Sequence, residues 1–155
     1  MISEYAQATD WSSATAKREN DQNLYRLIRK QIGRRKTIRS LSFPSHHWQF
    51  EQGLIYAMRG RDRTFHFHGV ELDPIVGIEA NVTAAVLQKK YRHCTFVIPK
   101  YPCQLRNYIA DFPIQYNLVY CDWMGTWGKE KREDVVSLFS NSMFMNNSIF
   151  ICTVM

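Results

Sequence analysis

Apolar residues along this chain fall into short runs separated by segments with helical spacing. Strand-like runs occur at 37–43, 64–72, 94–98, 116–121 and 147–155. Between them, apolar residues recur three and four positions apart, as on one face of a helix. This spacing predicts helices over 17–32, 47–58, 74–90, 101–110 and 131–144. Such strict alternation predicts an α/β fold with a parallel sheet covered by helices on both faces.

The periodicity also predicts which side of each helix is buried. The residues expected to face the core are Leu24, Leu27, Ile28 and Ile32, then Phe50, Leu54, Ala57 and Met58, then Ile75, Ile78, Val82, Ala85 and Val86, and finally Val135, Leu138, Phe139 and Met143. Asp73 and Pro74 are typical of a helix cap and a first helical position. We expect Ser45 to cap the helix that follows it, over 47–58.

Right-handed crossovers between parallel strands restrict the topologies open to such a chain. We expect a doubly wound sheet of five strands in the order 3-2-1-4-5. Residues 17–155 are predicted to form a single domain that includes a basic N-terminal helix. Residues 1–16, which are rich in Ser, Thr and Ala, are predicted to be a flexible lead-in.

The residues just after each strand are the candidates for a ligand site. In open doubly wound sheets, ligands bind outside the carboxyl ends of the strands, at the point where the strand order reverses. Glu71 stands there in the segment GVELDP. A carboxylate in that place can accept two hydrogen bonds from a ribose diol. The alternative is that Glu71 is a solvated strand end.

Glu71 and the segment YNLVYCDWMGTW resemble motifs of class I S-adenosylmethionine-dependent methyltransferases. In that family the second strand typically ends in an acidic residue that binds the ribose, and the fourth ends in an acidic or amide residue near the methyl acceptor. The resemblance implies that S-adenosylmethionine is the cofactor. It implies cofactor binding by Pro44, Ser45, Glu71, Leu72 and Asp122, with Asp122 also in the catalytic role.

The resemblance covers roughly residues 37–155 and has clear departures. The first loop, SFPSHHWQFE, lacks the family's glycines, and Glu51 at its end faces either the pocket or solvent. Trp123 and Met124 follow the acidic residue where amino-methylating members have two prolines and an aromatic. This difference disfavours methylation of an amino group on a base. Trp123 and Trp127 either stack on a base or pack their loop onto the sheet.

The family usually adds two further strands at the far edge of the sheet. Their absence leaves 147–155 as a possible exposed edge. We expect either a second subunit or another partner to cover this edge, or a reduced domain without catalysis.

The net charge of +6 is concentrated in one segment. Between Lys17 and Arg39 stand nine of the 20 basic residues and two of the 14 acidic ones. Such a stripe favours nucleic acid as a partner, with Arg34, Arg35 and Lys36 as the binding residues. A solvated helix face is the alternative.

Other features narrow the function classes. The four cysteines have no CxxC spacing, so reduced and largely buried thiols are expected. His66 and His68 share one strand face and are expected to be polar sheet positions rather than metal ligands. No apolar run approaches the roughly 20 residues of a membrane span, and the N-terminus lacks a signal-like apolar region. We therefore expect no membrane association and a cytoplasmic protein.

Two hypotheses follow from the sequence. The first is a methyltransferase that uses S-adenosylmethionine and acts on nucleic acid. The second is a non-catalytic module of the same fold that binds nucleic acid or a protein through its basic segment.

Overall fold

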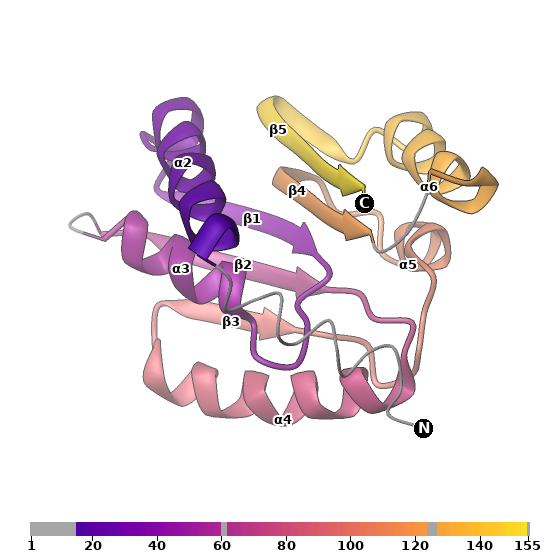
Figure 1. Cartoon of the computed structure of the whole chain (residues 1–155), viewed down its shortest axis with the longest axis horizontal. Coiled ribbons are helices and arrows are strands. Elements are labelled where there is room, and N and C mark those ends of the chain that lie inside the picture. The colour runs from indigo at the N-terminus through magenta and orange to yellow at the C-terminus, as the bar shows by residue number, and fades with distance from the viewer. Residues whose placement is uncertain (1–14, 60–61, 124–126, 155) are drawn as a thin grey trace.

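The computed structural model describes residues 15–59, 62–123 and 127–154. The helices are α2 (Thr15–Ile32), α3 (Gln49–Ala57), α4 (Pro74–Lys90), α5 (Leu105–Asp111) and α6 (Lys129–Ser140). The strands are β1 (Thr37–Ser42), β2 (Thr64–Gly69), β3 (Cys94–Val97), β4 (Tyr116–Trp123) and β5 (Phe144–Val154). These elements alternate as predicted (Figure 1). Most of the predicted lead-in, residues 1–14, lies outside the described residues.

The strands form one parallel sheet in the order β3-β2-β1-β4-β5, which confirms the predicted fold class and topology. All arrows in Figure 1 accordingly point the same way. From β1 the chain moves outward to β3 and then returns to place β4 on the other side of β1. The strand order therefore reverses between β1 and β4. In the part of the chain described, β5 ends the sheet on one side and β3 on the other.

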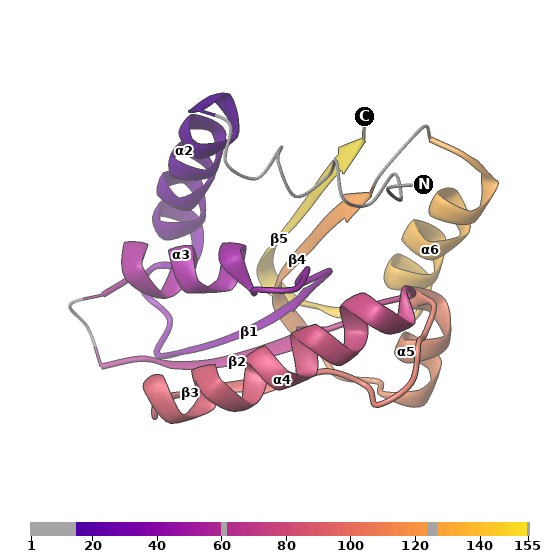
Figure 2. The same cartoon turned by 60° about the horizontal axis from the view of Figure 1, so that its bottom comes forward.

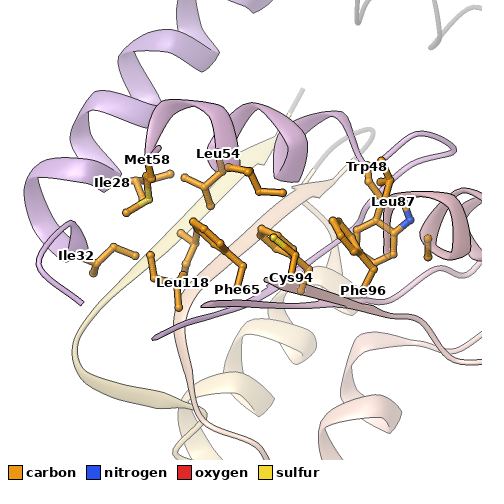
Figure 3. Close-up of a cluster of buried hydrophobic side chains, with 14 residues drawn as sticks. Ile28, Ile32, Trp48, Leu54, Met58, Phe65, Leu87, Cys94, Phe96 and Leu118 are labelled. Carbon is orange, nitrogen blue, oxygen red and sulfur yellow. The ribbon is translucent and has the colours of Figure 1, made fainter. Parts of the chain in front are cut away.

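Two apolar clusters lie on opposite faces of the sheet. One holds side chains from α2, α3 and α4, and the other holds side chains from α5 and α6. Figure 3 shows the first cluster, in which Ile28, Leu54 and Leu87 meet Phe65 and Phe96 of the sheet. Alternate residues of each strand point to opposite faces, so β1 contributes Ile38 to one cluster and Leu41 to the other.

The buried side of α4 differs from the prediction. Ile75, Ile78, Val82 and Val86 are each at least 60% exposed. The residues that face the sheet are Val76, Ala80, Ala84 and Leu87. Because this helix is apolar on both sides, its spacing fits two orientations. The side with the alanines faces the sheet because their small side chains let the α4 backbone approach the sheet closely.

Some element ends and core residues also differ from the prediction. The helix predicted over 131–144 ends at Ser140, and Phe144 begins β5 instead. The helix predicted over 101–110 starts only at Leu105. Leu27 and Phe139 are exposed rather than buried. Both stand at the margin of their apolar stripe, where spacing alone decides burial poorly.

The start of α4 is as predicted. The Asp73 carboxylate accepts hydrogen bonds from the backbone N–H of Ile75 (2.8 Å) and Val76 (3.2 Å), and Pro74 is the first helical residue. Asp73→Ala should lower the free energy of unfolding by about 1 kcal/mol, because two backbone donors lose their acceptor. Urea unfolding followed by circular dichroism checks this value. An unchanged midpoint would contradict the role of the cap.

Two further findings concern the helices and the cysteines of the described residues. None of the described helices combines the length and apolar character required to cross a bilayer. The four cysteines are unpaired; Cys94 and Cys121 are buried and Cys103 is partly buried. Cys152 is exposed on β5, so the expectation of a buried thiol was wrong for this residue.

Candidate functional site

Glu71 and Asp122 lie at the same edge of the sheet, on either side of β1. Ser42, the last residue of β1, pairs with Gly69 of β2 and with Tyr120 of β4. Glu71 and Asp122 each follow their paired residue by two positions. By this register both residues lie just beyond the last paired residue of β1, one on each side of it. The strand order reverses here, which is where such sheets bind ligands.

The Glu71 carboxylate is held by its own loop. Its Oε1 accepts hydrogen bonds from the backbone N–H of Leu72 (2.9 Å) and Asp73 (3.1 Å). Its Oε2 accepts no hydrogen bond from the described residues. Burial is the main reason that the pKa of Glu71 is raised, and these two backbone donors oppose that shift. One oxygen thus orients the group while the other remains available, and the Leu72 side chain beside it is exposed.

The first loop adopts a left-handed backbone without glycine. Ser45 and Trp48 have φ values of 53° and 52°. Such a conformation costs a non-glycine residue roughly 1 kcal/mol or more. Trp48, not Ser45, occupies the N-cap position of α3, so the predicted cap was wrong. Pro44 is buried and accepts a hydrogen bond from the Trp48 backbone N–H (3.0 Å), whereas Ser45 is exposed.

Two tertiary contacts hold this loop against its neighbours. The Trp48 indole N–H donates to the backbone oxygen of Ala80 in α4 (2.8 Å). His46 Nδ1 contacts the carboxylate of Glu79 in the same helix. A Cβ on Gly69 would lie 2.7 Å from Pro44 and 2.8 Å from Trp48. Glycine is therefore required at the end of β2, one strand away from the loop where the family pattern places it.

Asp122 lies inside β4, whereas the sequence placed it in the following loop. Its Oδ1 accepts a hydrogen bond from the Thr153 hydroxyl of β5. Trp123 is buried and packs against Phe43 and Trp127, with ring centroids 5.7 and 5.8 Å away. Of the two alternatives for Trp123, these contacts support packing. Met124 lies outside the described residues.

The strand histidines have polar partners on the face that carries α5 and α6. His66 Nδ1 lies 2.8 Å from the Thr95 hydroxyl, and His68 Nδ1 lies 2.8 Å from the Tyr108 hydroxyl. Burial lowers the pKa of His68 to about 4, so this imidazole is neutral at physiological pH. No three potential metal ligands come together within the described residues.

The predicted basic residues lie at the other edge of the sheet. Arg34, Arg35 and Lys36 directly precede β1, whereas Glu71 and Asp122 lie beyond the carboxyl ends of their strands. The six residues of β1 separate the two edges by about 20 Å. The structure thus brings Pro44, Ser45, Glu71, Leu72 and Asp122 to one edge and leaves the three basic residues at the opposite one.

Glu51 faces β1 rather than a pocket or solvent. It is fully buried, and its Oε1 accepts a hydrogen bond from the Ser42 hydroxyl at the end of β1. Its Oε2 has no hydrogen-bond partner among the described residues. Burial raises the pKa of this carboxyl to about 7. A sequence signal existed, because Glu51 precedes Leu54 by three and Met58 by seven positions and so belongs to the buried stripe.

Sequence and structure comparisons differ in what they find. No family model matches the sequence, and no curated protein matches it. Among solved structures, the crystal structure of TrmN from Thermus thermophilus aligns with a TM-score of 0.49 and 12% identity, over 85% of this chain and 37% of that one. The SAM-dependent methyltransferase from Agrobacterium tumefaciens aligns with 0.53 and 5%, over 86% and 44%. The delta-N METTL16 MTase domain aligns with 0.46 and 11%, over 79% and 52%.

The chain therefore spans between 37% and 52% of the length of these structures. At such low identities the likeness concerns the fold, and the alignment with the Agrobacterium tumefaciens enzyme is the one above a TM-score of 0.5. The protein has a class I methyltransferase-like fold.

Proposed function

We propose that the protein is an S-adenosylmethionine-dependent methyltransferase that acts on nucleic acid. The observation that carries this proposal is the pair of carboxylates, Glu71 and Asp122, one on each side of β1 just beyond its last paired residue. The fold supports it, and the similar structure from Agrobacterium tumefaciens is named as SAM-dependent. For this chain the cofactor, the acceptor and the residue roles below are parts of the proposal.

The residues at this edge fit the chemistry of the cofactor. The free Oε2 of Glu71 can accept hydrogen bonds from ribose hydroxyls while Oε1 keeps the carboxylate in place. The exposed Leu72 side chain offers an apolar surface for the adenine. The Ser45 hydroxyl and the first backbone N–H groups of α3 suit the carboxylate of the amino acid part, since a helix N-terminus favours anions. The buried Pro44 stabilises this loop through its hydrogen bond with the Trp48 backbone N–H.

The cofactor supplies a methyl group on a positively charged sulfur. Methyl transfer from such a centre depends largely on positioning, which can contribute several powers of ten in rate. Asp122 would accept a hydrogen bond from the acceptor and orient it. The Thr153 hydroxyl donates a hydrogen bond to Oδ1 and so restrains the orientation of the Asp122 carboxylate. Arg34, Arg35 and Lys36 would bind the phosphates of the nucleic acid at the opposite edge.

Calorimetric titration with S-adenosylmethionine tests the cofactor site. Wild-type protein should bind, and Glu71→Ala should bind at least about 100-fold more weakly, because two charge-assisted hydrogen bonds are lost. Glu130→Ala is the matched control, since this carboxylate is exposed on the first turn of α6. Because Glu71 also accepts two backbone hydrogen bonds, circular dichroism must verify that the variant is folded. Unchanged binding by a folded Glu71→Ala would contradict the assignment.

A non-catalytic nucleic-acid-binding module is the second candidate. The position of Arg34, Arg35 and Lys36 at the edge opposite to the two carboxylates favours this candidate. A nucleic acid bound by these basic residues does not need to reach Asp122. The same titration separates the two functions. Absence of cofactor binding at millimolar concentration, together with retained binding of nucleic acid, would favour the second candidate over the first.

A further inference from the structure

The N-terminal edge of the sheet carries two neighbouring surface hollows. Lys36, Arg63 and His93 stand one residue before β1, β2 and β3, so all three lie along this edge. The carboxyl ends of α2, α3 and α4 reach the same edge, since each helix leads into one of these strands (Figures 1 and 2). This edge is opposite to Glu71 and Asp122.

The first hollow is aromatic and has a volume of about 320 Å³. Its lining includes the buried side chains of Met58 and Phe65, which also belong to the apolar cluster of Figure 3. Its more exposed lining comes from Tyr56, Tyr91 and His93. Tyr91 and Phe65 each meet the His93 ring edge to face, at 6.4 and 6.2 Å between centroids. Such a volume is at the lower end of the range for ligand pockets, about 300 Å³ upwards.

Cations surround this aromatic hollow. The Arg59 guanidinium lies 4.0 Å from the centroid of the Tyr56 ring, and the Lys90 ammonium lies 5.0 Å from that of Tyr91. Lys89 and Arg92, which flank Lys90 and Tyr91 in the sequence, are also exposed. A flat ring that enters the hollow would therefore meet aromatic faces and positive charge together.

The second hollow is basic and has a volume of about 300 Å³. It is lined by Arg34, Arg35, Lys36, Asp62 and Arg63. Arg63 is buried and donates hydrogen bonds to the backbone oxygens of Gly33 and Met58, which joins the carboxyl ends of α2 and α3. Because Met58 lines the first hollow and Arg63 lines the second, the hydrogen bond between them places the two hollows next to each other.

The charges favour a polyanion as the partner. Among the described residues that line the two hollows, the exposed Arg34, Lys36 and Arg59 stand against one exposed carboxylate, Asp62. Basic residues at helix carboxyl ends also stabilise the helix dipoles, which explains part of this arrangement. Stabilisation of helix dipoles does not explain Tyr56, however. This tyrosine is 64% exposed and lies beside a hollow whose buried lining is apolar.

We propose that this edge is a binding site for single-stranded nucleic acid, with one base in the aromatic hollow and neighbouring phosphates against Arg34, Lys36 and Arg59. A single strand fits better than a duplex, because only an unstacked base can enter the hollow. This inference rests on the nucleic-acid part of the proposed function. It adds a base-binding position, and it places the anchor of the strand about 20 Å from the acceptor site.

The tyrosines give the most specific test. Fluorescence anisotropy with labelled 12-nucleotide single strands of RNA and of DNA, without cofactor, measures the affinity. Tyr56→Ala/Tyr91→Ala should bind at least about tenfold more weakly, because stacking on an aromatic side chain contributes to the affinity of each bound base. Tyr101→Ala is the matched control, since Tyr101 is an exposed tyrosine that follows β3 at the other edge. The oligonucleotide that binds with the higher affinity, RNA or DNA, identifies the natural ligand class.

The basic residues predict a change in salt dependence. Arg34→Ala/Lys36→Ala should weaken binding and lower the slope of log affinity against log salt by about 0.7 for each lost phosphate contact. The tyrosine variant should keep the wild-type slope, because it loses no charge. Arg132→Ala on α6 is the control for a basic residue away from this edge. Equal slopes for all variants would overturn the phosphate assignment.

Other outcomes would overturn the proposal. Wild-type affinity of the tyrosine variant would exclude a base in the hollow, and equal binding of a duplex would exclude a requirement for an unstacked base. Binding to phosphatidylserine vesicles without binding to either single strand would make this edge a membrane-facing surface. Glu71→Ala should leave the oligonucleotide affinity unchanged, so failure of the cofactor site and failure of this site are distinguishable.

Discussion

Trp48→Ala should lower the free energy of unfolding by about 4 kcal/mol, which is in the range for a buried large aromatic residue. The Trp48 side chain is fully buried between α3 and α4. It packs edge to face against Phe96 at 5.4 Å, and its indole N–H donates to the Ala80 oxygen. Truncation removes these contacts, and the neighbouring backbones cannot close the space completely. Urea unfolding at neutral pH measures the loss.

Two further tryptophan variants serve as comparisons for this prediction. Trp48→Phe should cost about 2 kcal/mol, because the ring packing is partly kept while the hydrogen bond to Ala80 is lost. Trp127→Ala, at a partly exposed position, should change stability by less than about 1 kcal/mol. A loss below 1 kcal/mol for Trp48→Ala would mean that the first loop does not depend on this indole.

The first loop illustrates how this chain builds a turn without glycine. Ser45 and Trp48 accept left-handed backbone conformations. The hydrogen bond of the Trp48 indole and the burial of Pro44 stabilise the loop enough to offset that strain. The glycine that permits close approach is Gly69, at the end of the neighbouring strand. The missing family motif is thus compensated in space rather than at the same place in the sequence.

The strand order could be predicted because it follows from general rules. Short apolar runs that alternate with helices leave few arrangements once crossovers must be right-handed. The common edge for Glu71 and Asp122 follows from the same rules, since the carboxyl ends of parallel strands coincide. Their position just beyond Ser42, one on each side of β1, required the register of β1 with both neighbours, which no sequence pattern contains.

The buried side of α4 could not be predicted, because two opposite faces of this helix are apolar. Hydrophobicity alone favours the face with Ile78 and Val82, whose side chains are larger than those of Ala80 and Ala84. The close approach to Trp48 selects the alanine face instead. Packing geometry therefore overrides the stronger hydrophobic signal in this helix.

The aromatic hollow was also invisible to sequence analysis. Tyr56 and Tyr91 stand at the ends of two different helices, and His93 stands before β3. They come together only because successive crossovers of a parallel sheet return to the same edge. The basic segment itself could be predicted, since its residues are consecutive, but its separation from Glu71 and Asp122 required the three-dimensional arrangement.

Glu51→Gln should gain stability relative to the wild type as the pH is raised from 4.5 to 8. Burial raises the pKa of the Glu51 carboxyl from 4.5 to about 7. In the folded protein the neutral form is therefore favoured. Between pH 4.5 and 7 the unfolded chain releases this proton while the folded chain keeps it, so stability falls as the pH rises. Above about pH 7 the penalty of the buried charge is complete.

Glutamine resembles the neutral carboxyl and removes this dependence on pH. The stability difference between Glu51→Gln and wild type should shift by about 3 kcal/mol between pH 4.5 and pH 8, at 1.36 kcal/mol for each pKa unit. Any cost of an unpaired amide group in the variant is the same at both pH values, so it cancels in this comparison. Urea unfolding at several pH values measures the two curves.

The exposed Glu130 provides the control for this titration, because Glu130→Gln should shift the stability difference by less than about 0.5 kcal/mol over the same range. Parallel curves for Glu51→Gln and wild type would mean that Glu51 ionises normally in the folded protein. The expected divergence would place a group that titrates near neutral pH directly beneath the first loop, through its bond to Ser42. In that case the anchoring of α3 on β1 depends on pH, and the affinity of the adjoining cofactor site should fall as stability does.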